Sequence, residues 1–392
     1  MLPSASAVCT LVMQLFFVSL TAAAFTPAST TSTDWLATRG LFSLGIEQFK
    51  HIFSGPRGGC HLGNAAIRRE WSSLPRAQRK AYTDAVLCLQ SKPARTNQTL
   101  VPGARSRHEY DDFVWTHIEQ TLSIHGTTNF LSWHRYFTWT YEQALRDECG
   151  YQGYQPNWGK TALDPVNSQV FDGSPYSMGG NGDYVPHNCT NALPSGLNCI
   201  PAGNGGGCVT QGPFRDMKVN LGPVTPTLAA EGIVSSSPVS AYNPRCLRRD
   251  ITSWVSSRWS TDALSASLIR ENDDISTFQT VMQGDFASGF YGVHTAGHFT
   301  MAGDPSGDIF ASPGDPAFWL HHAQIDRTWW IWQNQNLAAR QNAIGGTITL
   351  DNSPASRPGR LEDPLSLGVN APNITIGDAM STLAGPFCYI YL

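Results

Sequence analysis

Charged residues are scarce in this chain of 392 residues, because Asp, Glu, Lys and Arg together make up only 14% of it and the formal net charge is -4. A chain without a basic run is not expected to bind nucleic acid or an anionic membrane surface. Its hydrophobic content of 41% is too high for a disordered chain. We therefore expect one large globular domain that acts on small, uncharged molecules.

Long apolar runs are also missing. The best candidate, Leu11 to Leu20, is shorter than the roughly 20 residues that a membrane-spanning helix needs. Small residues follow it at Ala22 to Ala24, which is typical of a signal-peptide cleavage site, although no Lys or Arg precedes the apolar run. The pattern predicts a signal peptide over residues 1–24, a secreted domain over residues 25–392 and no membrane anchor.

The chain contains no CxxC pair, which argues against a zinc knuckle. Eight cysteines remain outside the predicted signal: Cys60, Cys88, Cys149, Cys189, Cys199, Cys208, Cys246 and Cys388. An even number in a secreted chain predicts disulfides, whose pairing stays open at this point. Asn97, Asn188 and Asn373 begin N-x-S/T triplets and predict glycosylation of a secreted surface.

Apolar residues at three- and four-residue spacings predict a mainly α-helical fold. The expected helices cover 35–53, 65–90, 105–126, 127–150, 244–272, 290–301 and 315–341. Residues 151–243 are rich in Gly, Pro, Asn and Ser and are expected to form long loops held by disulfides; few short strands are expected, one of them over 346–350. We predict a four-helix bundle core that holds a dinuclear metal site.

Only eleven histidines occur, and seven of them gather in two stretches. His117 lies on one predicted helix, His125 near its end and His134 one turn into the next helix. Antiparallel helices joined by a short connection can aim three such imidazoles at one point. A single buried histidine is more often structural than a metal ligand, but two clusters in aromatic surroundings favour metal binding.

His294 and His298 start the second cluster, with an i, i+4 spacing that places both imidazoles on one helix face. His321 or His322 can supply a third imidazole. The zinc-hydrolase pattern H-E-x-x-H is absent, because Thr295 stands where its glutamate would be. Sites made only of imidazole nitrogen suit copper. The remaining histidines are expected at the surface or around the site: His51, His61, His108 and His187.

Two stretches resemble the signatures of the tyrosinase and catechol oxidase family of dicopper proteins. "HGTTNFLSWHRYFTWTYE" matches the first at His125, Phe130, Leu131, Trp133, His134, Arg135 and Glu142. "DPAFWLHHAQID" matches the second at Asp315, Pro316, Phe318, Trp319, His322 and Asp326. The terminal "CYIYL" is similar to the Tyr-x-Tyr motif that ends the catalytic domain in short secreted fungal members, so a C-terminal shielding domain is not expected.

The resemblance implies that two copper ions are the cofactors. His117, His125 and His134 would bind the first copper, and His294, His298 and His322 the second, with His321 as a neighbour. Phe318 would pack near the metals, Asp326 would hold a metal ligand or a nearby arginine, and Arg135 would form a structural ion pair. The implied reaction is the oxidation of o-diphenols, and also of o-aminophenols, to quinones or quinone imines by O2.

Some positions depart from the family pattern. Ser123 replaces the cysteine that some relatives link to the second histidine, so no thioether is expected, and Thr138 replaces an aliphatic residue. Thr295 stands where some tyrosinases have an asparagine that holds a water near the phenol. Ile309 aligns with a bulky gate residue of plant relatives. Gln283 and Asp285 lie in the region of the acidic partner, whose identity stays open, as does the residue that acts as base.

These departures favour catechol oxidation, with weak hydroxylation of monophenols left open. Three alternatives remain at this stage. A true tyrosinase would hydroxylate monophenols strongly at the same site. An oxygen carrier would use the same copper chemistry but shield it with a further domain. A secreted binding protein would hold structural zinc.

Overall fold

The computed structural model describes residues 32–51, 59–101, 109–159, 164–191, 199–225, 228, 231–285 and 288–392. The predicted signal peptide and His108 lie outside these residues, as does the side chain of His51. Within the described residues, no helix is both long and apolar enough to cross a bilayer.

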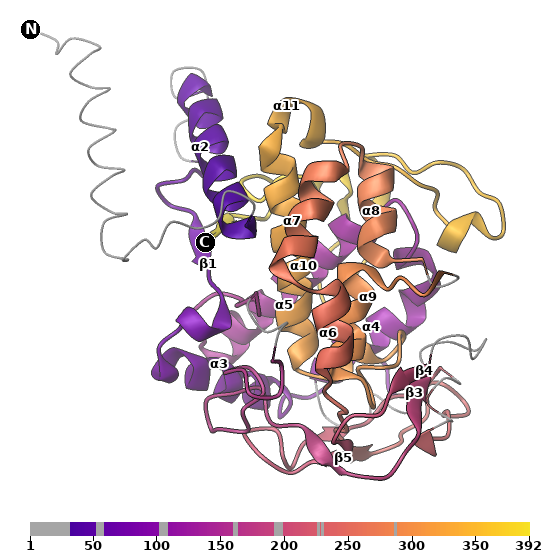
Figure 1. The fold of residues 1–392 in the computed structure, drawn as a ribbon. Coiled ribbons are helices and arrows are strands. Elements are labelled where there is room, and N and C mark those ends of the chain that lie inside the picture. The colour runs from indigo at the N-terminus through magenta and orange to yellow at the C-terminus, as the bar shows by residue number, and fades with distance from the viewer. Residues whose placement is uncertain are drawn as a thin grey trace, which may run out of the picture.

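Four helices form the centre of the molecule: α4 (Glu109–Ile124), α5 (Phe130–Cys149), α9 (Gly292–Met301) and α10 (Ala317–Gln335). α10 packs directly against α5 and α9 and runs through the middle of the fold (Figure 1). The predicted class, a mainly helical protein with a bundle core and disulfide-stapled loops, is confirmed.

Further helices surround this bundle: α2 (Thr33–His51), α3 (Arg76–Leu89), α6 (Ser253–Trp259), α7 (Asp262–Glu271), α8 (Ile275–Gln283) and α11 (Leu337–Arg340). Single 3-10 turns occur at η1 (Trp71–Ser73), η5 (Ser312–Gly314), η6 (Leu350–Asn352) and η7 (Gly377–Ala379). α2 and α7 both pack on α10, which therefore has protein on most of its sides. This explains why nearly every residue of α10 is buried, including Trp319, Trp329 and Trp332.

Local signals set several helix ends. Gly150 adopts a left-handed conformation (φ 68°) directly after α5, where its N–H bonds the carbonyl of Leu145. The Thr261 hydroxyl accepts a hydrogen bond from the N–H of Leu264 at the start of α7, and Asp274 accepts one from Thr277 at the start of α8. The predicted single helix over 244–272 is wrong, because Arg245–Cys246 lie in a short strand and the helical part is divided into α6 and α7 by the cap at Thr261. α8 was not predicted.

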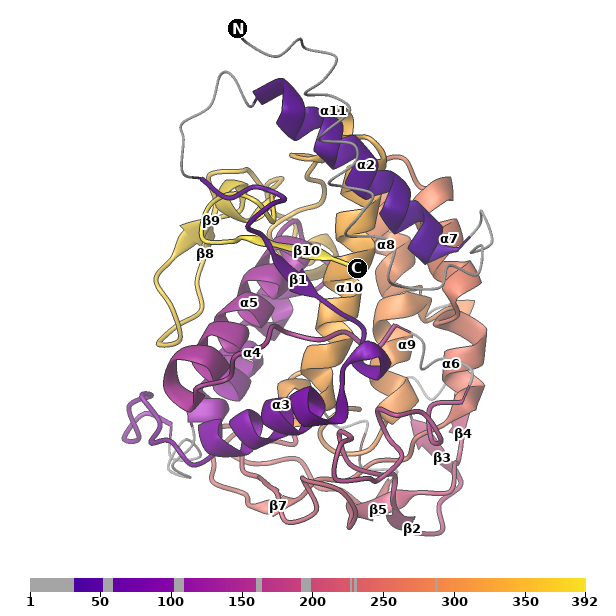
Figure 2. The same cartoon turned by 90° about the vertical axis from the view of Figure 1, so that its left-hand side faces the viewer.

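The strands are short and pair in twos. They are β1 (Ala66–Arg68), β2 (Gly182–Tyr184), β3 (Cys189–Asn191), β4 (Cys199–Pro201), β5 (Gly206–Val209), β6 (Lys218–Val219), β7 (Arg245–Cys246), β8 (Pro364–Leu365), β9 (Ile374–Thr375) and β10 (Tyr389–Tyr391). β1 pairs in parallel with β10, so the two distant parts of the chain lie side by side (Figure 2). β2 pairs with β5, β3 with β4, β6 with β7, and β8 with β9, all antiparallel.

Two further predictions of local structure are wrong. Residues 65–90 are not one helix, because 66–68 form β1, whose partner lies at the far end of the chain and leaves no trace in the local periodicity. Residues 346–350 are not a strand; only Thr347 makes an isolated bridge, and Leu350 begins a 3-10 turn.

The eight predicted cysteines form four disulfides: Cys60–Cys388, Cys88–Cys149, Cys189–Cys199 and Cys208–Cys246. The first fastens the segment before β1 to the segment before β10. The second joins α3 to the end of α5. The last two staple the long loops between α5 and α6, as the composition of residues 151–243 predicts.

Candidate metal centre

The first histidine cluster is held in place by the main chain. The Nδ1 atoms of His117, His125 and His134 lie 2.7, 2.9 and 2.7 Å from backbone carbonyl oxygens. These carbonyls belong to Phe310, Thr121 and Phe130 in that order. A carbonyl only accepts hydrogen bonds, so each Nδ1 must carry the proton. The lone pair of each imidazole is therefore on Nε2.

The three rings converge. Their centroids lie 5.1 Å apart for His117 and His125, 5.0 Å for His125 and His134, and 5.7 Å for His117 and His134. The Nε2 atoms of His117 and His134 are buried and have no hydrogen-bond partner. Burial lowers the pKa of His125 to about 4, which keeps its imidazole in the neutral form that binds metals.

The second cluster comes from α9 and α10. His294 and His298 project from one face of α9, with ring centroids 4.9 Å apart, as the i, i+4 spacing predicts. His322 approaches from α10, and its Nε2 lies 3.3 Å from Nε2 of His298. Both ring nitrogens of His294 and the Nδ1 atoms of His298 and His322 are buried without partners. Burial lowers the pKa of all three, so each ring is neutral and has one nitrogen with a free lone pair.

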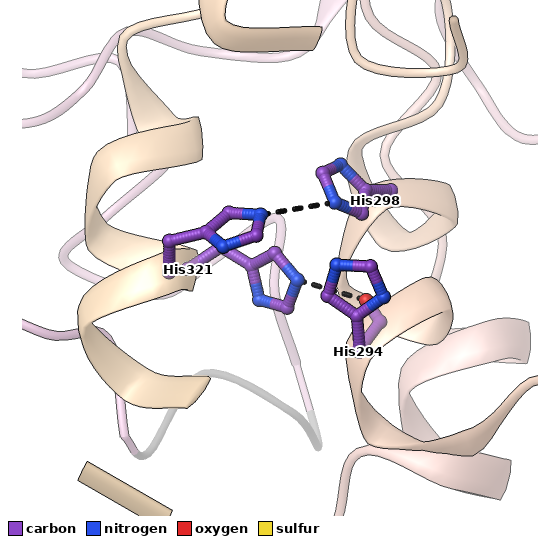
Figure 3. Close-up of side chains that lie close together, drawn as sticks. His294, His298 and His321 are labelled. Carbon is purple, nitrogen blue, oxygen red and sulfur yellow. Dashed lines mark hydrogen bonds between the residues drawn. The ribbon is translucent and has the colours of Figure 1, made fainter. Parts of the chain in front are cut away.

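His321 also lies in this cluster, but its ring is used differently. Its Nε2 lies 2.8 Å from the main-chain oxygen of His294, so it donates a proton there (Figure 3). Gly297 makes room for the ring, because a Cβ at that position would lie 2.1 Å from Cε1 of His321. His321 therefore braces α9 against α10, while its Nδ1 is buried without a partner like the free nitrogens of its neighbours. The choice of His322 as the metal-facing imidazole stays a prediction from the second signature stretch.

The two clusters face each other across the bundle. His134 and His322 stack with ring centroids 4.5 Å apart, and His125 lies 6.0 Å from His294. Phe318 is fully buried and contacts both sides, at 4.1 Å from the ring of His322 and 5.6 Å from that of His117. Within each cluster, the potential donor nitrogens all lie within 4.8 Å of one another.

This donor set fits two metal ions that prefer imidazole. Two groups of neutral, buried, convergent rings with unpaired nitrogens would be costly if nothing used those nitrogens. No carboxylate or thiolate of the described residues belongs to either cluster. Ligation by nitrogen alone is what copper favours among first-row ions.

A buried ionic network ties the two ligand-bearing helices together. Arg135 of α5 donates from Nε to Oδ1 of Asp326 on α10 at 2.6 Å, and both residues are almost fully buried. The hydroxyls of Tyr389 and Tyr391 each donate to Oδ2 of Asp326 at 2.6 Å. Arg68 also reaches this carboxylate, at 3.5 Å. The structure therefore assigns Asp326 to an arginine rather than to a histidine ligand.

Sequence reasoning missed Arg68. It lies in β1, donates from Nε to Glu142 Oε2 at 2.9 Å and covers the ring of Tyr389 at 3.7 Å. No local signal marks it, because its partners are brought to it by the β1–β10 pairing. Glu142 also accepts the N–H of Gln155 at 2.7 Å, which explains a glutamate in the first signature stretch.

The residues expected to influence which phenols react have the following positions. The Thr295 hydroxyl donates to the carbonyl of Gln283 at 2.8 Å, and the Gln283 side chain accepts the N–H of Gly126 at 2.8 Å. Ile309 is 45% exposed and precedes Phe310, whose carbonyl holds His117. Asp285 is exposed on the loop after α8. Ser123 points its hydroxyl at the carbonyl of Gln120.

The other predicted positions lie at the surface or away from the clusters. His61 is exposed, and His187 lies 2.9 Å from Asp250 in the disulfide-stapled loops. Asn97, Asn188 and Asn373 are all exposed. The Thr138 side chain is buried in α5 with an unpartnered hydroxyl.

The common central domain of tyrosinase matches residues 107–335, which include all seven clustered histidines. The chain belongs to the tyrosinase family. It is 40% identical over 310 residues to the tyrosinase-like protein orsC of Emericella nidulans, covering 76% of this chain and 81% of that one. It is 37% identical over 335 residues to tyrosinase P of Aspergillus terreus, covering 83% and 91%.

Among solved structures, a polyphenol oxidase variant of Thermothelomyces thermophila has a TM-score of 0.86 and 43% identity, over 92% of this chain and 97% of that one. The family expected from the two signature stretches is thus confirmed. Membership of this family, whose matched relatives are named tyrosinase and polyphenol oxidase, makes the chain an oxidase.

Proposed function

We propose that this tyrosinase-family oxidase binds two copper ions per chain and oxidises o-diphenols, and also o-aminophenols, to o-quinones or quinone imines with O2. One observation carries the proposal: two clusters of neutral, buried imidazoles face each other across the bundle, with their free nitrogens convergent. His117, His125 and His134 would hold the first copper, and His294, His298 and His322 the second. When bound, the copper pair would supply the electron transfer between the phenol and O2.

The protein would orient the metal ligands and exclude water from the site. Carbonyls fix the rings of the first cluster, so their Nε2 atoms need no reorientation when metal binds. Phe318, Phe130 and Trp133 are fully buried around the two clusters and exclude water from them. A dry site strengthens each metal–nitrogen bond and protects the reaction from side chemistry.

The balance between o-diphenols and monophenols rests on proton removal. A monophenol must lose its proton near the metals, and a positioned base or an ordered water can accept it. Here the Thr295 proton is committed to the Gln283 carbonyl, and the Gln283 side chain is committed to Gly126. These commitments support catechol oxidation over strong monophenol hydroxylation.

Secretion is part of the proposal. Four disulfides are expected in an oxidising compartment, and the three asparagines of the glycosylation triplets are exposed. An N-terminal sequencing of the protein from its natural source, together with release of glycans by a glycosidase, tests this. A mature chain that starts before residue 20 and carries no glycan would contradict it.

The deciding experiment is oxygen uptake by copper-loaded protein with matched monophenol, o-diphenol and o-aminophenol. Uptake with the two ortho-substituted compounds and a slow rate with the monophenol is the expected result. An equal rate with the monophenol would identify a true tyrosinase. Reversible O2 binding without turnover would identify an oxygen carrier, and stoichiometric zinc without turnover a structural metal protein.

A further inference from the structure

The start of α3 concentrates positive charge in an unusual way. Helix N-termini are positive and are normally capped by polar or acidic side chains. Here the capping position is Pro75, which offers no side-chain hydrogen bond, and the first turn contains no acidic residue. Arg76 and Arg79 follow, three residues apart, so both lie on the same side of the helix. These charges add to the helix dipole instead of opposing it.

Arg79 is largely buried, and one nitrogen of its guanidinium lacks a partner. Only 7% of the residue is exposed, and its Nε is buried with no hydrogen bond. The terminal nitrogens, Nη1 and Nη2, are not among the fully buried unpartnered atoms, and the side chain lines a cavity. Burial lowers the pKa of Arg79, opposed by the charge of Asp172, but an arginine stays charged at neutral pH. A largely buried guanidinium that lacks a partner at Nε and holds its charge is suited to bind an anion.

The neighbouring carboxylates leave this Nε without a partner. Asp172 Oδ1 accepts the N–H of Ser174 at 2.9 Å. Glu70 accepts from the Ser72 hydroxyl at 2.8 Å and the Ser73 N–H at 3.1 Å. Burial lowers the pKa of Arg79 and the charges of both carboxylates oppose this shift, but these hydrogen bonds go to the main chain and to a serine rather than to the guanidinium.

Arg79 also lines a cavity of about 350 Å³ between α3 and the loop after residue 164. Its other lining residues are Arg76, Gln169, Asp172, Ser174 and Tyr176. The Arg76 guanidinium lies 5.5 Å from the ring centre of Tyr176. The volume is at the lower end of that seen for small-molecule sites, and far more than one water needs.

We propose that this cavity binds a small oxyanion, a phosphate or a carboxylate, gripped by the fork of Arg79 and by Arg76 at the N-terminus of α3. Two parallel N–H donors of a guanidinium match two oxygens of such a group. The site is distinct from the histidine clusters, and none of its lining residues belongs to them. A bound anion would tie the loop of Asp172 to Tyr176 onto α3.

The test is a titration of the copper-loaded protein with inorganic phosphate, followed by calorimetry and by the thermal unfolding temperature. Potassium chloride at equal ionic strength is the blank, and acetate, a monocarboxylate that is not a chelator, replaces phosphate in a parallel series to separate the two oxyanion types. Saturable binding of one of them, with a rise in unfolding temperature that chloride does not give, is the expected result. The absence of saturable binding by both would overturn the proposal.

Variants locate the site. Arg79→Gln should weaken binding at least tenfold and Arg76→Gln less, whereas Lys80→Gln, which removes an exposed lysine paired with Asp84, should leave it unchanged. Asp172→Asn should tighten binding, because it removes a competing negative charge from the cavity, and it serves as a test even if Arg79→Gln does not fold. Unchanged affinity in both Arg79→Gln and Asp172→Asn would show that the anion binds elsewhere and would also overturn the proposal.

Discussion

The two histidine clusters solve the same problem by different means. In the first, three main-chain carbonyls hold the Nδ1 atoms, so the rings point inward before any metal arrives. In the second, no carbonyl of the described residues bonds the rings of His294, His298 or His322, which are placed by packing and by their contacts with one another. Only His321 donates to a carbonyl there. The comparison teaches that the first metal position is pre-organised, whereas the second depends on the fit between α9 and α10.

The largest expected effect comes from removing a ligand of the second cluster. His298→Ala should abolish oxidation of o-diphenols and leave about one copper per chain, because the pre-organised first cluster remains. Metal analysis and oxygen uptake measure both. Full activity in this variant would refute the ligand assignment, and loss of both coppers would show that the clusters do not bind independently.

Asp326→Asn should destabilise the helix packing that supports both clusters. The change weakens the compensation of two buried arginines, Arg68 and Arg135, that tie α5 to α10. Breaking such a buried network costs about 3–5 kcal/mol. Urea unfolding measures the loss. Lys80→Gln, which breaks an exposed pair with Asp84, is the control and should change stability by less than about 1 kcal/mol. A similar cost in both variants would contradict this account.

Gly297→Ala should affect the second cluster alone. The added methyl group would lie 2.1 Å from Cε1 of His321, so the ring must move and release the His294 carbonyl. We expect a loss of about 1–3 kcal/mol in stability and weaker binding of one copper only.

The matched control is Gly45→Ala in α2, where the new methyl group would lie 3.8 Å from its nearest neighbour in Leu62. That helix should gain up to about 1 kcal/mol. Equal losses of stability in the two variants would mean that Gly297 is not needed to make room for the ring of His321. The same conclusion would follow if Gly297→Ala weakened the binding of both coppers equally.

A chelator should remove the two coppers in separate steps. Partners that orient metal-bound histidines are worth about 10–100-fold in affinity, and only the first cluster has three of them. The copper of the second cluster should therefore leave first, at a chelator concentration lower by about tenfold or more. Copper content against chelator concentration in wild type and His298→Ala checks this. Loss of both coppers from the wild-type protein in a single step would contradict the expected difference in affinity between the two clusters.

Much of the site could be predicted from the sequence, because its key spacings are local. The i, i+4 pair His294 and His298 shares a helix face whatever the tertiary fold, and His125 and His134 flank a short turn between helices. The segments that were mispredicted depend on partners far away. β1 reads as helix in its own neighbourhood and becomes a strand only because β10 lies beside it.

The sequence by itself determined the helical class, the seven clustered histidines, the eight disulfide cysteines and the family. Only the tertiary structure decided how the cysteines pair, that the carbonyl of Phe310 orients His117 across 193 positions of chain, and that Arg68 completes the network around Asp326. It also left Nε of Arg79 buried without a partner. The physical reason is that helix periodicity is written in neighbouring residues, whereas hydrogen bonds and charges are satisfied by whatever the fold brings within reach.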